Sequence, residues 1–202
     1  MAEKTILLAT TNQGKLKELR SLLKEQAVEV LGLGDIDGGR SKPPEETGNT
    51  FCENALIKAT FWCGQSSLPT LADDSGLAVD FLGGAPGVYS ARFAGPAATD
   101  NDNNRLLLKR LDGVAEKDRT AAFHCCIAFC RFGEEPVTFA GRADGIILHG
   151  PQGEGGFGYD PLFYYPPLGK SFAQLLSTMK NRVSHRAVAL GEFVSWLRDN
   201  PL

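Results

Sequence analysis

The sequence predicts an α/β protein with a mixed β-sheet, and three observations lead to this prediction. Residues 5–9 form an apolar run typical of a strand buried on both faces, and a helical pattern follows it. Two long strand candidates, residues 121–132 and 137–148, flank a Gly-Glu-Glu-Pro segment that favours a hairpin. Residues 171–202 are expected to be helical, because an apolar stripe recurs there at helical spacing.

The first half of the chain predicts two strands and two helices. After the first strand, one helix face is marked by leucines at positions 16, 19, 22 and 23. Residues 28–33 predict a second short strand, and residues 35–44, rich in Gly, Pro and charge, predict a loop. A second helix is expected to run from Thr50 to about Cys63.

The middle of the chain predicts two further strands and a helix. Strand-like runs occupy residues 69–72 and 77–82, on either side of an Asp-Asp-Ser-Gly segment. Thr99 and Asp100 make a plausible N-cap for a helix through a leucine-rich stretch, and Gly113 ends it. No internal repeat or low-complexity segment interrupts this order.

Composition restricts the class of protein. With 202 residues, 43% hydrophobic and 22% charged, the chain is typical of a soluble globular protein of one large domain or two small lobes. A net charge of −3 gives no global attraction to nucleic acid or membranes. The first apolar run is too short for a signal peptide, and no apolar run is long enough to span a membrane, so a cytoplasmic protein is expected.

The five cysteines have no C-x-x-C spacing, and their number is odd. This pattern favours reduced, buried thiols over a zinc or disulfide framework.

Asp73 and Asp74, followed by Ser75 and Gly76, lie between two apolar runs. Adjacent carboxylates cost desolvation free energy unless a cation compensates them. Hard oxygen ligands beside a serine suit Mg²⁺, which binds through one or two carboxylates plus substrate phosphates. All four residue types also favour turns, so a simple turn is the alternative.

The loop from Thr10 to Lys15 joins the first strand to the first helix. A strand, a Gly-containing polar loop, a helix N-terminus and a Lys together form an anion-binding arrangement. It is not a Walker A loop, because Ala9 stands where that motif requires glycine. The alternative is an N-capped helix with a solvent-facing Lys15.

Three further segments are candidates for binding groups. Glu45 and Glu46 precede a helix start, where acids commonly interact with the helix dipole, but they could also supply a metal ligand. Residues 150–158 carry five glycines, and Phe157 among them is poorly placed for core packing. Ser184-His185-Arg186 opens the last helix against the dipole rule, one turn after Lys180, and is either a solvated basic patch or a site for an anionic or acceptor-rich ligand.

Six motifs in series resemble the pyrophosphatases of non-standard purine nucleoside triphosphates, the inosine and xanthosine triphosphatases. They run over about residues 5–197: Ala9-Thr10-Thr11-Asn12-Gln13-Gly14-Lys15; Glu45-Glu46-Thr47-Gly48 with Phe51 and Glu53-Asn54-Ala55; Ala72-Asp73-Asp74-Ser75-Gly76-Leu77; Gly84-Ala85-Pro86-Gly87 with Ser90-Ala91-Arg92; Gly156-Phe157-Gly158-Tyr159-Asp160-Pro161; and Ser184-His185-Arg186. The resemblance implies one α/β domain over residues 1–202, with two lobes around a long mixed sheet flanked by helices and a substrate cleft between the lobes. It also implies a homodimer that needs Mg²⁺ to cleave the bond between the α- and β-phosphates of ITP, dITP or XTP, releasing a monophosphate and pyrophosphate.

The resemblance further implies which residues form the site. Asp74 matches the proton acceptor and a metal ligand, Glu46 matches the second metal ligand, and Lys15 is expected to act in catalysis. Substrate-binding positions are Thr10, Thr11, Asn12, Gln13, Gly14, Lys15, Lys58, Ser75, Phe157, Gly158, Tyr159, Asp160, Lys180, His185 and Arg186. In this interpretation Lys15, Lys58 and Lys180 neutralise the charge of the triphosphate. Phe157 stacks on the base, and His185 and Arg186 donate hydrogen bonds to O6 and N7 of hypoxanthine or xanthine.

Three other functions compete with this interpretation. The septum-inhibitor-like nucleotide pyrophosphatases resemble Ser-x-Ser-Pro-Arg-Arg in the first loop, whereas this chain has Thr10 to Lys15. A non-catalytic nucleotide-binding module has no need of Glu46, Asp73 and Asp74 together. A nucleic-acid binder conflicts with the acidic net charge.

Overall fold

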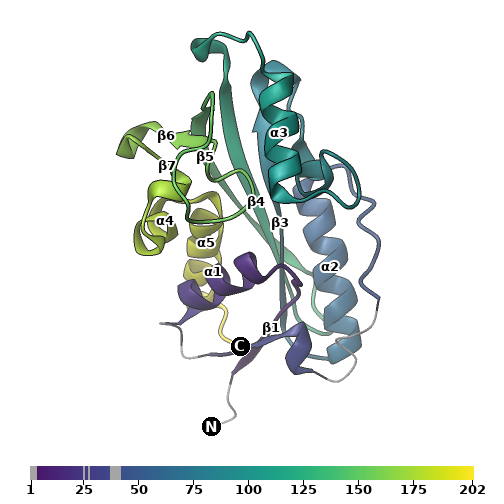
Figure 1. Cartoon of the computed structure of the whole chain (residues 1–202). Coiled ribbons are helices and arrows are strands. Elements are labelled where there is room, and N and C mark those ends of the chain that lie inside the picture. The colour runs from purple at the N-terminus through teal and green to yellow at the C-terminus, as the bar shows by residue number, and fades with distance from the viewer. Residues whose placement is uncertain (1–3, 25, 27, 37–41) are drawn as a thin grey trace. The chain divides into compact units, whose positions relative to one another are not determined.

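The computed structural model describes residues 4–24, 26, 28–36 and 42–202, and its strands form one seven-stranded sheet in the order β2-β1-β3-β4-β5-β6-β7 (Figure 1). The strands are β1 (Thr5–Leu8), β2 (Glu29–Gly32), β3 (Thr70–Val79), β4 (Thr120–Cys130), β5 (Val137–Ile147), β6 (Phe163–Tyr165) and β7 (Lys170–Ser171). β1 pairs in parallel with β2 and β3, whereas β6 is antiparallel to β5 and β7. The predicted α/β class with a mixed sheet is confirmed.

Five α-helices accompany the sheet in the described part of the chain: α1 (Gln13–Leu23), α2 (Phe51–Ser66), α3 (Asp100–Arg110), α4 (Ser177–Val183) and α5 (His185–Asp199). The first three begin at residues whose side chains accept a hydrogen bond from the backbone N–H three positions later: Asn12, Thr50 and Thr99. Such caps satisfy N–H groups that have no partner within the helix. The N-cap predicted at Thr99 is confirmed.

The chain divides into two compact units. The first comprises the described residues up to Asp74, together with Cys125–Gly141 and Arg186–Leu202; the second comprises Ser75–His124 and Arg142–His185. Strands β3, β4 and β5 contribute residues to both units. Among the described residues, no helix combines the length and apolarity needed to cross a membrane.

In the first unit, side-chain alternation along the strands builds two separate cores. Successive strand residues point to opposite faces of a sheet, so neighbours in β3 and β4 join different clusters. One cluster packs the strands against α1 and α5, through Leu71, Ile127, Phe129, Leu19 and Phe193. The other packs them against α2, through Ala72, Ala128, Ala55, Ala59 and Trp62. α1 and α5 therefore cover one face of this part of the sheet and α2 covers the other (Figure 1).

In the second unit, aromatic rings dominate the core. Phe123 of β4 packs on Phe163 of β6 and Phe172, with ring centroids 4.6 and 5.9 Å away. The buried guanidinium of Arg119 donates to the carbonyls of Leu111, Ile147 and Leu148, which ties the end of α3 to the end of β5.

The structure corrects the prediction of two strands separated by a turn in the middle of the chain. β3 runs without interruption from Thr70 to Val79, so Asp73, Asp74 and Ser75 lie within a strand. The turn alternative for these acids is therefore wrong. Turn propensity is a weak local preference, and here the buried partners of the two carboxylates outweigh it.

The helical prediction for residues 171–202 is correct only in part. Helices α4 and α5 occupy most of the segment, but Lys170–Ser171 form β7 and Phe172–Gln174 form a 3₁₀ helix. β6 and β7 were missed because strands of two or three residues leave no readable alternation. The loop predicted for residues 35–44 lies partly outside the described residues.

The prediction that no disulfide forms is wrong. Cys52, in the first turn of α2, is bonded to Cys126 of β4, with their Cα atoms 5.0 Å apart. Cys63, Cys125 and Cys130 are free, buried thiols, and burial raises the pKa values of Cys63 and Cys125 to about 12. The bonded pair is 74 residues apart in sequence, so only the packing of α2 on β4 reveals it.

Candidate active site

The loop between β1 and α1 is shaped by its own side chains. The hydroxyl of Thr10 accepts the backbone N–H of Asn12 at 3.2 Å, and the Asn12 side chain accepts that of Lys15 at 3.0 Å. Lys15 is not solvent-facing: its side chain is 15% exposed, and its ammonium lies 3.0 Å from Asp73. The predicted N-cap is therefore present, but Lys15 points at an acid of the neighbouring strand.

Asp73 is the centre of a buried ionic network on the α1 and α5 face of the sheet. Its carboxylate accepts Nε of Arg186 at 3.3 Å as well as the Lys15 ammonium, and Nη1 of Arg186 donates to Glu18 of α1. The side chains of Asp73 and Arg186 are 0% and 2% exposed. Burial opposes the charge on Asp73, but Lys15, Arg186 and Lys58 outweigh it and hold its pKa below the usual range. Burial likewise opposes the charge on Arg186, yet Asp73 and Glu18 raise its pKa.

Asp74 lies on the opposite face, in the frame formed by α2 and the segment before it. Its Oδ2 accepts a hydrogen bond from the Asn54 amide at 3.2 Å, and its Oδ1 lies 3.3 Å from the Lys58 ammonium. Lys58 also lies 3.3 Å from Glu46, so one ammonium bridges two carboxylates. Burial raises the pKa of Asp74, and Glu46 adds to the shift although Lys58 and Lys15 oppose it. The pKa of Lys58 is raised: burial acts against its charge, but Asp74, Asp73 and Glu46 prevail.

Adjacent acids thus have opposite electrostatic environments. Asp73 is compensated by two cations in direct contact, whereas Asp74 shares a single lysine with Glu46. A buried carboxylate with a raised pKa is under-compensated, which is the usual condition of a group that binds a cation or exchanges a proton.

The residues around Asp74 fit a divalent cation held partly by substrate. Within the described part of the chain, no group of three or more His, Cys, Asp or Glu side chains is arranged to hold a metal. Two carboxylates, Glu46 and Asp74, share the ammonium of Lys58. Mg²⁺ commonly binds through one or two carboxylates plus substrate phosphates, so this oxygen donor set suits it. Of the two adjacent glutamates, Glu46 is the one that contacts the Lys58 ammonium, whereas Glu45 is exposed.

The glycine loop and α4 lie in the second unit and form a second set of contacts. Lys180 and Asp160 make an ion pair at 2.6 Å, with side chains 6% and 3% exposed. Asp160 also accepts the backbone N–H of Phe157 at 2.9 Å, and the Lys180 ammonium lies 4.8 Å from the centroid of the Phe157 ring. This arrangement fixes the half-buried Phe157 ring at the end of the loop.

Backbone contacts hold the rest of this loop. Gly156 has φ +73°, and a Cβ there would collide with the Asp160 carboxylate, so glycine is required. The backbone N–H of Gly158 donates to Asp100 at 2.7 Å. The Tyr159 hydroxyl donates to the carbonyl of Ser90 at 2.9 Å, and burial raises the pKa of Tyr159.

His185 is the first residue of α5, and its ring stacks on Phe123 of the same unit. The ring centroids are 4.7 Å apart and the planes differ by 11°. His185 is 4% exposed, and its stacking on the Phe123 ring fixes the plane of the imidazole.

The predicted site residues are divided between the two units, so each unit contains part of the predicted site. The first unit contains Thr10, Thr11, Asn12, Gln13, Gly14, Lys15, Glu46, Lys58, Asp74 and Arg186, and the second contains Ser75, Phe157, Gly158, Tyr159, Asp160, Lys180 and His185. Ser75 is the residue after Asp74 on β3 and begins the second unit.

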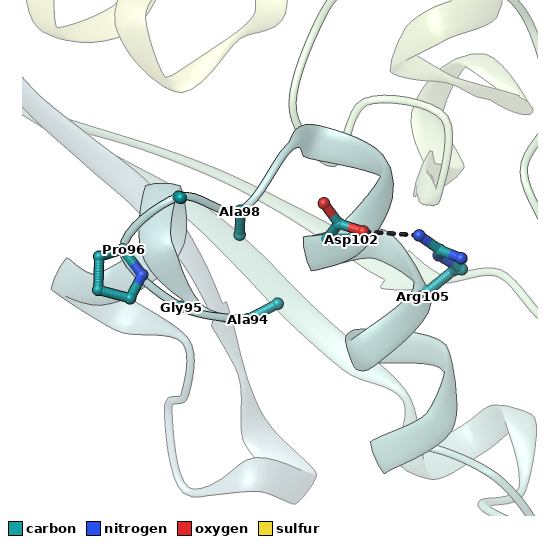
Figure 2. A pocket seen from close by; sticks show the side chains of 7 residues that line it. Ala94, Gly95, Pro96, Ala98, Asp102 and Arg105 are labelled. Atoms are coloured by element: carbon teal, nitrogen blue, oxygen red, sulfur yellow. Dashed lines mark hydrogen bonds and ion pairs between the residues drawn. The ribbon is translucent and has the colours of Figure 1, made fainter.

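A separate pocket in the second unit is a weaker candidate. It is lined by the loop Ala94 to Ala98 and by Asp102 and Arg105 of α3, which pair at 2.6 Å (Figure 2). Arg105 is 78% exposed, and exposed ion pairs contribute little binding free energy. None of the predicted site residues lines this pocket.

Comparison with known proteins decides the family. The Ham1 family model matches residues 6–196, nearly the whole chain. The chain belongs to the Ham1 family. A dITP/XTP pyrophosphatase of Yersinia pseudotuberculosis is 47% identical over 196 residues, which cover 96% of this chain and 98% of that protein. This membership confirms the resemblance predicted from the six motifs.

Solved structures of Ham1 proteins share the fold. The Staphylococcus aureus Ham1 protein matches with a TM-score of 0.86 and 38% identity, over 98% of this chain and 100% of that one. A HAM1 protein from Coxiella burnetii also matches with a TM-score of 0.86, at 40% identity, over 96% of this chain and 98% of that one.

Sequence reasoning left two contacting residues out of the predicted site. Asn54 contacts Asp74, and the signal was present, because Asn54 and Lys58 are four residues apart on one helix and point the same way. Glu18 contacts Arg186 from 168 residues away, and no local pattern could have identified that pair.

Proposed function

We propose that this chain is a nucleoside triphosphate pyrophosphatase for non-standard purines. It hydrolyses dITP, ITP and XTP between the α- and β-phosphates and releases the monophosphate and pyrophosphate. The relatives named dITP/XTP pyrophosphatase support the substrate class. The observation that carries the reaction is the frame of Glu46, Lys58 and Asp74, in which two carboxylates share one ammonium.

Mg²⁺ is the metal we propose, held by Glu46 and Asp74 together with the substrate phosphates. The charges around Asp74 support this choice. The ammonium of Lys58 meets two carboxylates, Glu46 and Asp74, so one negative charge is left over. A highly charged triphosphate meets net repulsion there unless a divalent cation accompanies it. When bound, the ion neutralises phosphate charge and lowers the pKa of water.

The side chains of the chain itself bind the triphosphate and handle the proton. Lys15 and Lys58 exchange part of their contact with carboxylates for contact with phosphate oxygens, and Lys180 is proposed to do the same. Asp74 orients the attacking water and accepts its proton. Its raised pKa brings the carboxyl closer to the range in which a general base works.

Base recognition is proposed for Phe157, His185 and Arg186. Phe157 offers a ring face for stacking, while His185 and Arg186 offer donors for O6 and N7 of hypoxanthine or xanthine. Adenine has an amino group in place of O6, so the donor directed at O6 meets a donor of the base, whereas N7 is an acceptor in all three bases. Asp73 and Glu18 hold the Arg186 guanidinium, and Phe123 holds the His185 ring plane.

Residues 1–202 are proposed to act as one domain, in a cytoplasmic homodimer that removes deaminated purines from the nucleotide pool. The substrate cleft between the lobes remains a prediction. Sedimentation of the purified chain measures the oligomeric state directly.

The test of the function is pyrophosphate release from ITP, dITP, XTP, GTP and ATP, with Mg²⁺ and with EDTA. We expect activity on the first three, little on ATP, and none in EDTA. Orthophosphate and a diphosphate as the products from ITP would contradict the proposed bond cleavage. Full activity in EDTA would contradict the metal.

A further inference from the structure

Asn54 is a buried polar residue in contact with Asp74, and the proposed reaction gives it no role. It lies in the first turns of α2 and is 1% exposed. A buried amide is costly unless both its donor and its acceptor are satisfied. The contacts it makes therefore show what the residue does.

The two ends of the Asn54 amide contact two different parts of the site. Its Oδ1 accepts the backbone N–H of Gly48 at 2.8 Å, and its Nδ2 donates to Oδ2 of Asp74 at 3.2 Å. Only the oxygen can accept from an N–H, and only the nitrogen can donate to a carboxylate. The orientation of the amide is thereby fixed by its surroundings.

The packing around Gly48 shows that its contact with Asn54 is close. A Cβ at position 48 would lie 2.7 Å from Oδ1 of Asn54 and 2.6 Å from Cβ of Glu53. Glu53 also accepts the backbone N–H groups of Asn49 and Thr50, at 2.6 and 3.1 Å. The start of α2 therefore anchors the segment that carries Glu46, two residues before Gly48.

The carboxylate of Asp74 is divided between two partners of α2. Asn54 occupies Oδ2, and Lys58, one turn later, approaches Oδ1. Because the donor to Oδ2 comes from a buried side chain, it limits rotation of the carboxylate about its Cβ–Cγ bond. Oδ1 is then directed toward Lys58, which also contacts Glu46.

We propose that Asn54 is a positioning residue for the carboxylate of Asp74. Its donor sets the rotation of Asp74, and its acceptor holds the Glu46 segment in place beside it. The proposal rests on the function proposed above, because that function makes Asp74 the acting group. Hydrogen-bond partners of ligating or reacting carboxylates commonly change activity by about 10–100-fold when they are removed.

Two substitutions test the amide. Asn54→Leu loses both hydrogen bonds, whereas Asn54→Asp keeps an oxygen for the Gly48 N–H and replaces the amide donor with a second carboxyl group beside Asp74. We expect both variants to lower kcat for ITP by about 10–100-fold. We expect less than about a threefold change in the affinity for a non-hydrolysable α,β-methylene analogue of ITP, measured by calorimetry with Mg²⁺. Wild-type kcat in Asn54→Leu would overturn the positioning role of Asn54.

The second unit offers a matched control in Asn103 of α3. Asn103 is 3% exposed, accepts the backbone N–H of Ala94 at 2.8 Å and donates to the carbonyl of Ala91 at 3.2 Å. Asn103→Asp and Asn103→Leu therefore remove the same kinds of hydrogen bond at similar burial, away from any acidic partner. We expect them to lower the melting temperature but to leave kcat within about twofold of the wild-type value. An equal loss of kcat in the Asn103 variants would mean that destabilisation alone explains the result.

A measurement without substrate separates this proposal from the proposed function. We expect the effects of Asn54→Leu and Asp74→Asn on the unfolding equilibrium to be non-additive, whereas Asn103→Leu and Asp74→Asn combine additively. Additive effects of Asn54→Leu and Asp74→Asn would overturn the contact on which the proposal stands. A wild-type protein inactive on ITP, with this coupling intact, would instead overturn the proposed function.

Discussion

Replacing Asp73 and replacing Asp74 by asparagine should affect the protein differently. Asp73→Asn should lower the stability of the fold, whereas Asp74→Asn should lower the activity and leave the stability nearly unchanged. Asp73→Asn removes the charge that Arg186 and Lys15 contact, and the side chains of Asp73 and Arg186 are 0% and 2% exposed. Breaking a buried ion pair by removing one partner costs about 3–5 kcal/mol. Glu18 still contacts Arg186 in the variant, so we expect a loss of about 3 kcal/mol, near the lower limit of that range. For a chain of this size, that loss lowers the melting temperature by about 6–12 °C.

Asp74→Asn should leave the protein about as stable as the wild type, or slightly more stable. Burial raises the pKa of Asp74, which means that the charged carboxylate destabilises the fold, and the amide removes that charge. Lys58 keeps Glu46 as a partner. Activity on ITP should nevertheless fall by about 10²–10⁴-fold, because the proposed proton acceptor is lost.

The pH dependence of stability provides an independent check. The pKa of Asp73 is lowered from 3.8, so its stabilising contribution is present above that pH and is lost as the pH falls through and below it. The stability gap between wild type and Asp73→Asn should therefore narrow between pH 7 and pH values below about 4. The pKa of Asp74 is raised, so its cost appears as the pH rises above 3.8, and any advantage of Asp74→Asn should grow in the same direction.

The assay is urea unfolding of the wild type and both variants at pH 7 and at a pH well below 3.8, followed by circular dichroism. The reasoning fails if Asp73→Asn is as stable as the wild type at pH 7. It also fails if Asp74→Asn proves the less stable of the two variants.

Three further outcomes are expected. Lys15→Ala should raise KM and lower kcat for ITP together, because the ammonium meets phosphate in both the ground and transition states; an unchanged kcat/KM in steady-state assays would leave Lys15 with a purely structural role. Arg186→Ala should narrow the ratio of kcat/KM for ITP over ATP, whereas Lys15→Ala should reduce both substrates about equally; an intact ratio would remove Arg186 from base recognition. Reducing the disulfide between Cys52 and Cys126, which lie 74 residues apart in sequence, should lower the free energy of unfolding by about 4.5 kcal/mol in the chain-entropy model. Urea unfolding with and without dithiothreitol measures this loss, and Cys52→Ser should no longer respond to the reductant.

Local signals predicted the elements well where the pattern was long. The apolar run that became β1, the leucine face of α1 and the cap at Thr99 are all encoded in short windows of sequence. Long-range pairs were out of reach: Arg186 meets Asp73 across 113 residues, and no window contains both. The Cys52–Cys126 disulfide was not predicted for the same reason, because its two cysteines are 74 residues apart in sequence. The odd number of cysteines did not exclude it, since one pair can still meet in the fold.

The position of Asp73 and Asp74 within a strand explains why the two acids have different electrostatic environments. Turn-favouring residues suggested a break in the chain, whereas β3 continues and its alternation sends the two side chains to opposite faces. Asp73 therefore meets α1 and α5, where two cations compensate it. Asp74 meets α2, where Asn54 and a shared Lys58 leave its pKa raised. A carboxylate that two buried cations contact, as in Asp73, is a poor ligand and a poor base, because a new partner must compete with those cations. The under-compensated state of Asp74 lowers stability and is the property that a metal ligand or proton acceptor requires.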